Sequence, residues 1–358
     1  MELLSIVSAF SIQGNALECR AFGSGHINET YTVRTDADRR YILQKINQYV
    51  FRNPQAVMEN AIAITEYLRQ QDPDPRRALH FIQTKENAYW YVDDAGEFWR
   101  MYDFLDGFCL DQSESLADLY QSALAFGHFQ MMLSDFPAAT LHETIPHFHD
   151  TPDRFRQLRQ SVEENKAGRA DAVRDILDRL LQHEEMACSL QKLLDAGQLP
   201  LRVTHNDTKL NNVLLDNATR QYLCVLDLDT VMPGLSLYDF GDAVRFGAAT
   251  GTEDTRDLDN MGIDLEAYRV YARGFLETAT TLTEKELELL SLGPIVMTLE
   301  LVTRFLKDYL DGDLYFKTAY PEHNLVRAIA QLTLAEDMIR KLDIMQQIVR
   351  EELAKLPA

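Results

Sequence analysis

Signals for β-strands are concentrated in the first hundred residues of this 358-residue chain, whereas helical periodicity dominates the remainder. Strand patterns occupy residues 17–35 around a glycine-containing turn and continue at 39–47. Two aromatic-rich segments, 88–94 and 97–105, are joined by Asp-Asp-Ala-Gly, which is a hairpin signal. The pattern changes after Gly107. This order predicts an α+β protein, with a small mixed-sheet lobe followed by a larger, mainly helical lobe.

Helical spacing marks one segment of the first part and most of the second. Residues 54–70 begin with proline and carry apolar residues on one face from Val57 to Leu68. Further helices are expected over residues 114–135, 151–165, 171–197, 284–311 and 325–356. Two lobes also suit the length better than one compact core does.

The composition restricts the partners. The 35 Lys and Arg residues against 56 Asp and Glu residues give a formal net charge of −21. Such a surface repels nucleic acids and anionic membranes, so neither is expected as a partner. The four cysteines share no short spacing and are expected as separate, mostly buried thiols. The apolar N-terminus lacks a basic region, and no stretch suggests a membrane span, so we expect a cytoplasmic location. A monomer is also expected.

An island of strand signals interrupts the helical half. Its centre, residues 201–216, reads LRVTHNDTKLNNVLLD and places polar residues between two apolar runs. A short strand at 213–215 and a turn at 216–219 precede a return strand that ends in Asp227 and Asp229. Because a hairpin returns the second strand to the start of the first, Asp227 is expected near the polar residues.

This arrangement indicates a site built from oxygen atoms. Asp207, Asn212 and Asp227 supply two carboxylates and one amide, which are ligands that suit Mg²⁺ together with substrate phosphates. A carboxylate that does not bind metal can accept a proton from an attacking hydroxyl group, as in phosphoryl transfer. The island therefore predicts a phosphotransfer site.

The pattern His205-x-Asp207 followed by Asn212 and Asp227 resembles the catalytic loop and metal aspartate of the aminoglycoside phosphotransferase and choline kinase group, which has a protein-kinase-like two-lobe fold. Longer blocks resemble the bacterial N-acetylhexosamine 1-kinases. These blocks are YILQKIN, ETIPHFHDTP, LRVTHNDTKLNNVLLD, DLDTVMPGLSLYDFGDAVRFGA and RFLKDYLDGDLYFKTAYPEHNLVR, and they extend over most of the chain.

The resemblance implies roles for the island. Asp207 would be the general base that faces the anomeric hydroxyl group of the sugar. Asn212 and Asp227 would hold Mg²⁺ against the phosphates of ATP. His205 would brace the loop, and Asp229 would support the site, because alternate residues of a strand point to the same side.

The nucleotide is expected to contact a glycine turn and the hinge of the first lobe, with Gln44 of the third strand as a further candidate. The turn formed by Gly23, Ser24 and Gly25 would cover the phosphates, with His26 beside the sugar. The hinge between the lobes, near residues 102–107, would bind the adenine through Tyr102, Asp103, Phe104 and Leu105.

The third strand departs from the kinase pattern, because Gln44 stands where a phosphate-binding lysine is expected. Its neighbour Lys45 points to the other face of the strand and cannot replace that lysine. Glu59 on the following helix therefore has no assured lysine partner. Whether Gln44 contacts phosphate stays open.

The resemblance places Phe246, Arg304 and Tyr315 in the sugar pocket, where aromatic faces and a directed cation suit a pyranose. Two other residues have different expectations. Asp239 is expected to cap a helix rather than to bind metal, and Lys209 either reaches the transferred phosphate or faces solvent.

The resulting hypothesis is a nucleotide-binding lobe over residues 1–105 and a catalytic, sugar-binding lobe over 106–358. The reaction is ATP- and Mg²⁺-dependent phosphorylation of the C1 hydroxyl group of N-acetylglucosamine or N-acetylgalactosamine. Two alternatives stay open. One is another small-molecule kinase, acting on an aminoglycoside, choline or homoserine, and the other is a nucleotide-binding regulator that has lost catalysis.

Overall fold

The computed structural model describes residues 3–23 and 27–357. The chain forms two compact units. The first consists of Met1–Cys109, Asp135–Pro146 and Leu214–Met232, and the second of Leu110–Ser134, His147–Val213 and Pro233–Ala358.

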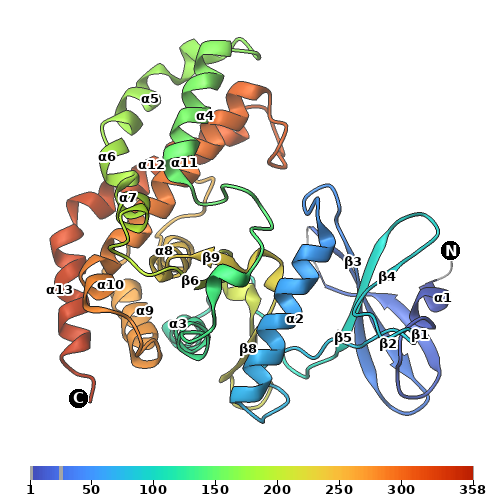
Figure 1. The fold of residues 1–358 in the computed structure, drawn as a ribbon. Helices are drawn as coiled ribbons and strands as arrows, with labels where there is room; N and C mark the ends of the chain where they lie inside the picture. The colour runs from blue at the N-terminus through green and yellow to red at the C-terminus, as the bar shows by residue number, and fades with distance from the viewer. Residues whose placement is uncertain (1–2, 24–26, 358) are drawn as a thin grey trace. The chain divides into compact units, whose positions relative to one another are not determined.

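The first unit is built on the sheet that the strand patterns predict (Figure 1). Its five strands lie in the order β1-β2-β3-β5-β4, and all of the neighbouring pairs are antiparallel. The strands are β1 (Ala16–Ala21), β2 (Glu29–Thr35), β3 (Arg40–Ile46), β4 (Tyr91–Val92) and β5 (Phe98–Asp103).

The two faces of this sheet have different environments. The short helix α1 (Leu3–Val7) contributes to an apolar cluster with alternate residues of the strands, among them Leu43 and Met101. Helix α2 (Pro54–Gln71) begins at the predicted proline, with Asn53 capping the N–H of residue 56. Met58 of α2 contacts Arg100 of β5, so α2 covers the face opposite to the Leu43 cluster.

The first unit also takes in a later hairpin. Strands β7 (Val213–Leu215) and β8 (Tyr222–Val225) form the predicted two-stranded sheet. Leu215 of β7 exchanges two backbone hydrogen bonds with Phe108, at 2.8 and 2.9 Å. The first unit is therefore not formed by residues before 105 alone, because backbone pairing joins the later hairpin to the segment just after β5. The unit also holds the 3-10 turns η1 (Ala138–Thr140) and η4 (Leu228–Thr230).

The second unit is mainly helical, as predicted. Its helices are α3 (Leu116–Met132), α4 (Thr151–Glu164), α5 (Arg174–Leu181), α6 (Glu184–Ala187), α7 (Ser189–Asp195), α8 (Ser236–Gly247), α9 (Leu265–Thr278), α10 (Glu284–Leu289), α11 (Gly293–Asp311), α12 (His323–Arg340) and α13 (Leu342–Leu353). Short elements complete it, namely η2 (Ala170–Val173), β6 (Arg202–Thr204), η3 (Leu210–Asn212), β9 (Met232–Gly234) and η5 (Leu290–Leu292).

Three features of this unit differ from the sequence expectations. The helix expected over 171–197 is divided into short pieces, and α9 was not anticipated. Within the described residues, the helical stretch Glu284–Asp311 is long and apolar enough to cross a membrane, although no span was expected. Its most apolar window is 78% buried inside the protein, as in a core helix. Helix α11, which ends this stretch, packs against α12 and α8 (Figure 1).

The thiols are less uniformly buried than predicted. Cys188 and Cys224 are buried, but Cys19 is half-buried and Cys109 is exposed, and all four are free of disulfides. Burial raises the pKa of the Cys19 thiol to about 11. The expectation of mostly buried thiols therefore holds for two of the four cysteines. The exposed Cys109 lies just after Gly107, where the chain has left the sheet.

Gly107 allows two backbone segments of the first unit to approach closely. A Cβ atom built there would lie 2.6 Å from the carbonyl oxygen of Leu215. The Gly107→Ala variant should lose about 1–3 kcal/mol of unfolding free energy, because rigid backbone must move to admit the methyl group. Urea denaturation monitored by circular dichroism measures this loss.

The control is Gly96→Ala, which adds a methyl group in open space but at a positive φ of 80°. It should cost about 1 kcal/mol through backbone strain alone. Equal or greater destabilisation by the control would contradict the steric argument.

Candidate active site

Two carboxylates of α8 hold the loop that follows β6. The two oxygens of Asp239 accept the backbone N–H groups of His205 and Asn206, each at 2.8 Å. Asp242 accepts the N–H of Thr208 at 3.1 Å. Burial raises the pKa of the Asp239 carboxyl group, although the imidazole and the donated amides oppose that shift. The loop backbone is thus fixed by the protein itself.

The expectation that Asp239 caps a helix was wrong. Helix α8 begins at Ser236 with Leu235 in the N-cap position, so Asp239 already lies within the helix. Its side chain also accepts a hydrogen bond from Gln130, and both residues are buried. The carboxylate therefore satisfies amides of a neighbouring loop rather than those of its own helix. A buried Asp inside a helix is the sequence signal that could have suggested this role.

The loop brings three of the polar residues together. The side-chain amide of Asn212 donates to the backbone oxygen of Asp207 at 2.8 Å and to its carboxylate at 3.2 Å. The ammonium group of Lys209 lies 2.9 Å from the other carboxylate oxygen. Lys209 therefore pairs with Asp207, although 40% of its side chain is exposed. Burial lowers the pKa of Lys209, but the charge of Asp207 outweighs it, and the net pKa is raised.

His205 has the surroundings of a brace. Its side chain is fully buried and meets the rings of Phe126 and Phe129 edge-on, at centroid distances of 5.5 and 5.9 Å. The backbone N–H of Asp207 donates to its Nδ1 atom at 3.3 Å. These contacts orient residue 207 and match the bracing role that the resemblance implied.

Asp227 lies in the first unit, at the turn after β8. It has left-handed backbone angles of φ 52° and ψ 65°, and the 3-10 turn η4 follows it. The strand-alternation argument that placed Asp229 on the same side as Asp227 was therefore wrong, because the strand ends at Val225. Asp tolerates the left-handed region better than most residues do, and such strain is typical of functional turns.

Asp229 is held by Arg100, a residue that sequence reasoning missed. Arg100 and Asp229 form an ion pair in which both residues are at least 97% buried. Asn28 donates to the second oxygen of Asp229 at 2.6 Å. Arg100 also donates to Gln44 at 2.9 Å, from the position directly opposite Gln44 on the adjacent strand. An arginine inside a buried, aromatic-rich strand was the available signal.

The expectations for Lys45 and Glu59 agree with the structure. Lys45 points to the opposite face and pairs with Glu29 at 2.5 Å. Glu59 is partly exposed and pairs with His142 at 2.7 Å instead of a lysine. Gln44 uses its amide nitrogen to donate to Thr30 at 3.0 Å. Gln44 is therefore part of a hydrogen-bonded row across the sheet.

The phosphate turn and the hinge are only partly defined. Ser24, Gly25 and His26 lie outside the described residues, and Gly23 has a positive φ of 79°. At the predicted hinge, the N–H groups of Asp103 and Phe104 already donate to backbone oxygens at 3.1 Å. Tyr102 of β5 packs edge-on against the ring of Phe81. Leu105 follows two residues after the end of β5.

A cavity of about 550 Å³ opens in the second unit beside the loop. Thr208 and Leu210 of the loop line it together with Phe246 at the end of α8. Phe246 is 36% exposed, which is unusual for a large aromatic residue in this helix. The two acidic residues that line the cavity have partners. Glu253 pairs with Arg245 at 3.1 Å, and Asp254 pairs with His323 at 3.1 Å.

Arg304 and Tyr315 form a separate cluster in the same unit. The guanidinium of Arg304 lies over the rings of Phe148, Tyr315 and Phe316, at centroid distances of 5.1, 5.9 and 5.6 Å. Tyr315 is 63% exposed. The cavity lining includes Phe246 but neither of these two residues. The structure therefore brings Arg304 and Tyr315 together, whereas Phe246 lines the cavity without them.

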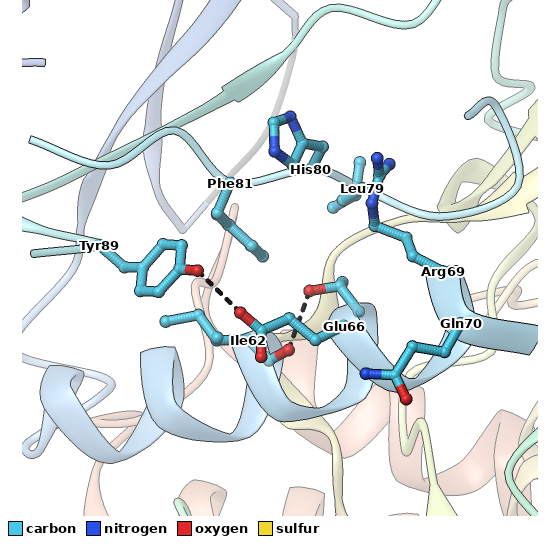
Figure 2. A pocket seen from close by; sticks show the side chains of 9 residues that line it. Ile62, Glu66, Arg69, Gln70, Leu79, His80, Phe81 and Tyr89 are labelled. Carbon is cyan, nitrogen blue, oxygen red and sulfur yellow. Dashed lines mark hydrogen bonds between the residues drawn. The ribbon is translucent and has the colours of Figure 1, made fainter. Parts of the chain in front are cut away.

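A smaller pocket, of about 280 Å³, lies in the first unit and contains none of the predicted site residues. Figure 2 shows that it lies between α2 and the segment that carries His80 and Phe81. The hydrogen bond from Tyr89 to Glu66, at 2.7 Å, crosses one end. Its walls mix one acidic, one basic and several apolar side chains without a convergent set of donors.

The five-stranded antiparallel sheet and the helical unit are the two parts of a protein-kinase-like fold. The model of the phosphotransferase enzyme family (APH) matches residues 18–273, and the chain belongs to this family. Solved structures share the fold along nearly the whole chain. A microcompartment-associated aminopropanol kinase is 18% identical, with a TM-score of 0.67 and coverage of 96% of this chain and 98% of the other.

Two further structures have the same fold. An aminoglycoside phosphotransferase from Alicyclobacillus acidocaldarius is 13% identical, with a TM-score of 0.65 and coverage of 98% and 97%. An amicoumacin kinase solved with AMP-PNP, Ca²⁺ and Ami is 11% identical, with a TM-score of 0.58 and coverage of 99% and 93%. The chain is accordingly a small-molecule phosphotransferase of the aminoglycoside phosphotransferase and choline kinase superfamily.

Replacing Asp239 by Asn should loosen the loop, because an amide cannot accept from two backbone N–H groups through two oxygens. We expect a loss of about 1.5–3 kcal/mol of unfolding free energy, the range for hydrogen bonds to charged groups, together with a lower kcat. Urea denaturation and steady-state assays measure the two effects.

Asp264→Asn is the matched control. Asp264 also accepts two backbone N–H groups, at 2.8 and 3.1 Å, but it caps the exposed start of α9. It should cost about 1 kcal/mol or less and leave kcat unchanged. If both variants behave alike, the special role of Asp239 is refuted.

Proposed function

We propose that this protein transfers the γ-phosphate of ATP, with Mg²⁺, to the C1 hydroxyl group of an N-acetylhexosamine, either N-acetylglucosamine or N-acetylgalactosamine. The observation that carries the proposal is the Arg304 cluster. A guanidinium fixed over three aromatic rings offers directed donors beside apolar faces. That combination suits the hydroxyl and acetamido oxygens and the C–H face of a pyranose.

The charges in the second unit support a neutral acceptor. A quaternary or primary amine needs a carboxylate or an open aromatic cage. The acidic residues on the cavity wall already pair with Arg245 and His323. The guanidinium of Arg304 already lies over the rings of its cluster, so a second cation there would meet a like charge. Aminoglycosides and choline, the substrates of the alternative kinases, therefore find less support among these residues.

Asp207 is the proposed general base. Its carboxylate is 29% exposed, and Lys209 and Asn212 fix both of its oxygens. An acceptor hydroxyl group placed beside it can pass its proton to the carboxylate as the oxygen attacks phosphorus. Lys209, at 2.9 Å, lies where a positive charge also favours the transferred phosphate. An inactive regulator would have no need of this arrangement.

The donor set fits Mg²⁺. Because the amide nitrogen of Asn212 donates to Asp207, its amide oxygen is the atom left as a ligand. Asp227 would supply a carboxylate. The described residues contain no group of three His, Cys, Asp or Glu residues arranged around a metal, in keeping with a site that needs an amide and phosphate oxygens. When bound, Mg²⁺ supplies charge neutralisation to the phosphates.

The nucleotide is proposed to lie against the first unit. Gly23, Ser24 and Gly25 would cover its phosphates, with His26 beside the sugar. Because the amides of Asp103 and Phe104 are already used, the backbone of Leu105 becomes the preferred hinge contact for adenine. A cytoplasmic monomer remains part of the proposal.

Asp207→Asn should lower kcat by roughly 10²–10⁴-fold, the usual contribution of a general base, and leave ADP affinity unchanged. The control is Asp216→Asn in the β7–β8 turn, where the side chain caps two turn amides, accepts from the Thr219 hydroxyl group and pairs with Arg76 on the exposed surface. Coupled ADP-release assays over N-acetylhexosamines, hexoses, aminoglycosides, choline and homoserine identify the acceptor, and ³¹P NMR identifies the phosphorylated oxygen. Turnover only with an amine would refute the sugar proposal, and no turnover at all would favour the regulator.

Arg304→Met should raise KM for the N-acetylhexosamine by roughly tenfold or more, which corresponds to a charged hydrogen bond of about 1.5–3 kcal/mol, without changing KM for ATP. Arg273→Met is the control, because Arg273 also stacks on a tyrosine ring, at 4.8 Å, but on the exposed surface of α9. A change in KM for ATP alone would show that Arg304 does not serve the acceptor.

A further inference from the structure

The third strand has no cation at position 44, but the sheet face that carries Gln44 holds one on the neighbouring strand. Arg100 stands opposite Gln44 on β5, and Thr30 stands opposite Gln44 on β2. The three side chains form a continuous row, with Gln44 donating to Thr30 at 3.0 Å and Arg100 donating to Gln44 at 2.9 Å. Both ends of the Gln44 amide are therefore used to orient neighbours. Gln44 relays a hydrogen-bonded row that ends in a guanidinium.

The guanidinium is deeply buried and makes one ion pair. Arg100 is 3% exposed, and its partner Asp229 is 2% exposed. Burial alone would lower the pKa of Arg100, but the carboxylate of Asp229 raises it, and Asp227 adds to the same effect. Burying such a pair is costly unless further hydrogen bonds satisfy its atoms. Here Gln44 and Asn28 supply those bonds.

Asp229 belongs to a backbone segment that needs support. The preceding Asp227 has a left-handed backbone, which a non-glycine residue adopts at a cost of about 1 kcal/mol or more. Two other contacts hold the segment, since Thr144 donates to the carbonyl of Asp229 at 3.3 Å and the buried Asn60 donates to that of Val231 at 3.0 Å. Arg100 provides the only charged contact among these.

We propose that Arg100 is a positioning residue that takes the place of the missing third-strand lysine: it fixes Asp229, and through Asp229 the turn that presents Asp227 to the metal–nucleotide complex. The inference rests on the nucleotide and metal part of the proposed function and is independent of the acceptor. The charge sits one strand away from its expected position and acts through a carboxylate instead of touching phosphate.

The test measures ADP affinity with and without Mg²⁺ by isothermal titration calorimetry, in the absence of any sugar. Arg100→Met should reduce the gain in affinity that Mg²⁺ provides by roughly tenfold or more, as for other residues that orient metal ligands. Affinity for ADP without Mg²⁺ should change little. The double variant Gln44→Lys/Arg100→Met, which returns the cation to the third strand, should recover most of the gain.

Folding is controlled separately, because Arg100→Met leaves Asp229 buried without its partner. Arg100→Met/Asp229→Leu replaces the pair with apolar side chains and should fold, yet it should still lack the Mg²⁺-dependent gain. Lys45→Met removes a cation from the opposite face of the sheet, on β3, and should bind as the unmodified protein does. Thermal denaturation reports folding for each variant.

The outcomes are distinct. A folded apolar-pair variant with the full Mg²⁺-dependent gain would overturn the positioning role while leaving the proposed function intact. A failure of the relocated lysine to restore the gain would also count against substitution of one cation for the other. Absence of any Mg²⁺-dependent ADP binding by the unmodified protein would reject both this inference and the metal part of the proposed function.

Discussion

The buried carboxylate of Asp239 makes the contacts on which the loop after β6, with the proposed base Asp207, depends. Its position is set by the depth of α8, since a Cβ atom at Gly241 would lie 2.5 Å from the backbone of Gly293 at the start of α11. Close packing of the two helices thus brings Asp239 to the amides of His205 and Asn206. Because these amides immediately precede residue 207, helix packing controls the direction of the proposed base. A displacement of α8 would be transmitted to that residue without any contact with substrate.

The two units solve the same problem in different ways. Each contains a non-glycine residue with left-handed backbone at a proposed functional position. In the second unit it is Asn206, with φ 64°, just before the proposed base, and in the first unit it is Asp227 itself, with φ 52°. Beside Asn206 the restraint is a carboxylate that accepts backbone amides. Beside Asp227 it is the ion pair of Asp229 with Arg100. In both cases a buried charge, which is strong in a low-dielectric interior, over-determines a strained turn.

Much of the fold was predictable because it follows local periodicity. The strands β1 to β5, helix α2 and the β7–β8 hairpin each carry their pattern within a few residues. The superfamily and the coarse phosphotransferase activity likewise follow from one short motif, His205-x-Asp207 with Asn212 and Asp227, and the family match agrees. Three contacts could not be anticipated in this way. Asp239 with His205, Asp229 with Arg100, and Gly107 with Leu215 join residues that are 34 to 129 positions apart, and no local pattern encodes such pairings. The turn at Asp227 was misjudged because a strand period was extended past the residue where the strand ends.

The net charge of −21 raises the question of how such a protein accepts a polyanionic nucleotide. Exposed charges are screened beyond about 8 Å at physiological salt, so the total charge matters less than the cations nearest the phosphates. Among the described residues, Arg100 is buried within the first sheet, and Lys209, whose side chain is 40% exposed, lies beside Asp207. Each is already paired with a carboxylate, Asp229 or Asp207. Neither therefore presents a bare positive charge, and the excess charge that balances the phosphates must come from the metal. Affinity for the nucleotide should then depend more strongly on Mg²⁺ than in a kinase with an unpaired phosphate-binding lysine.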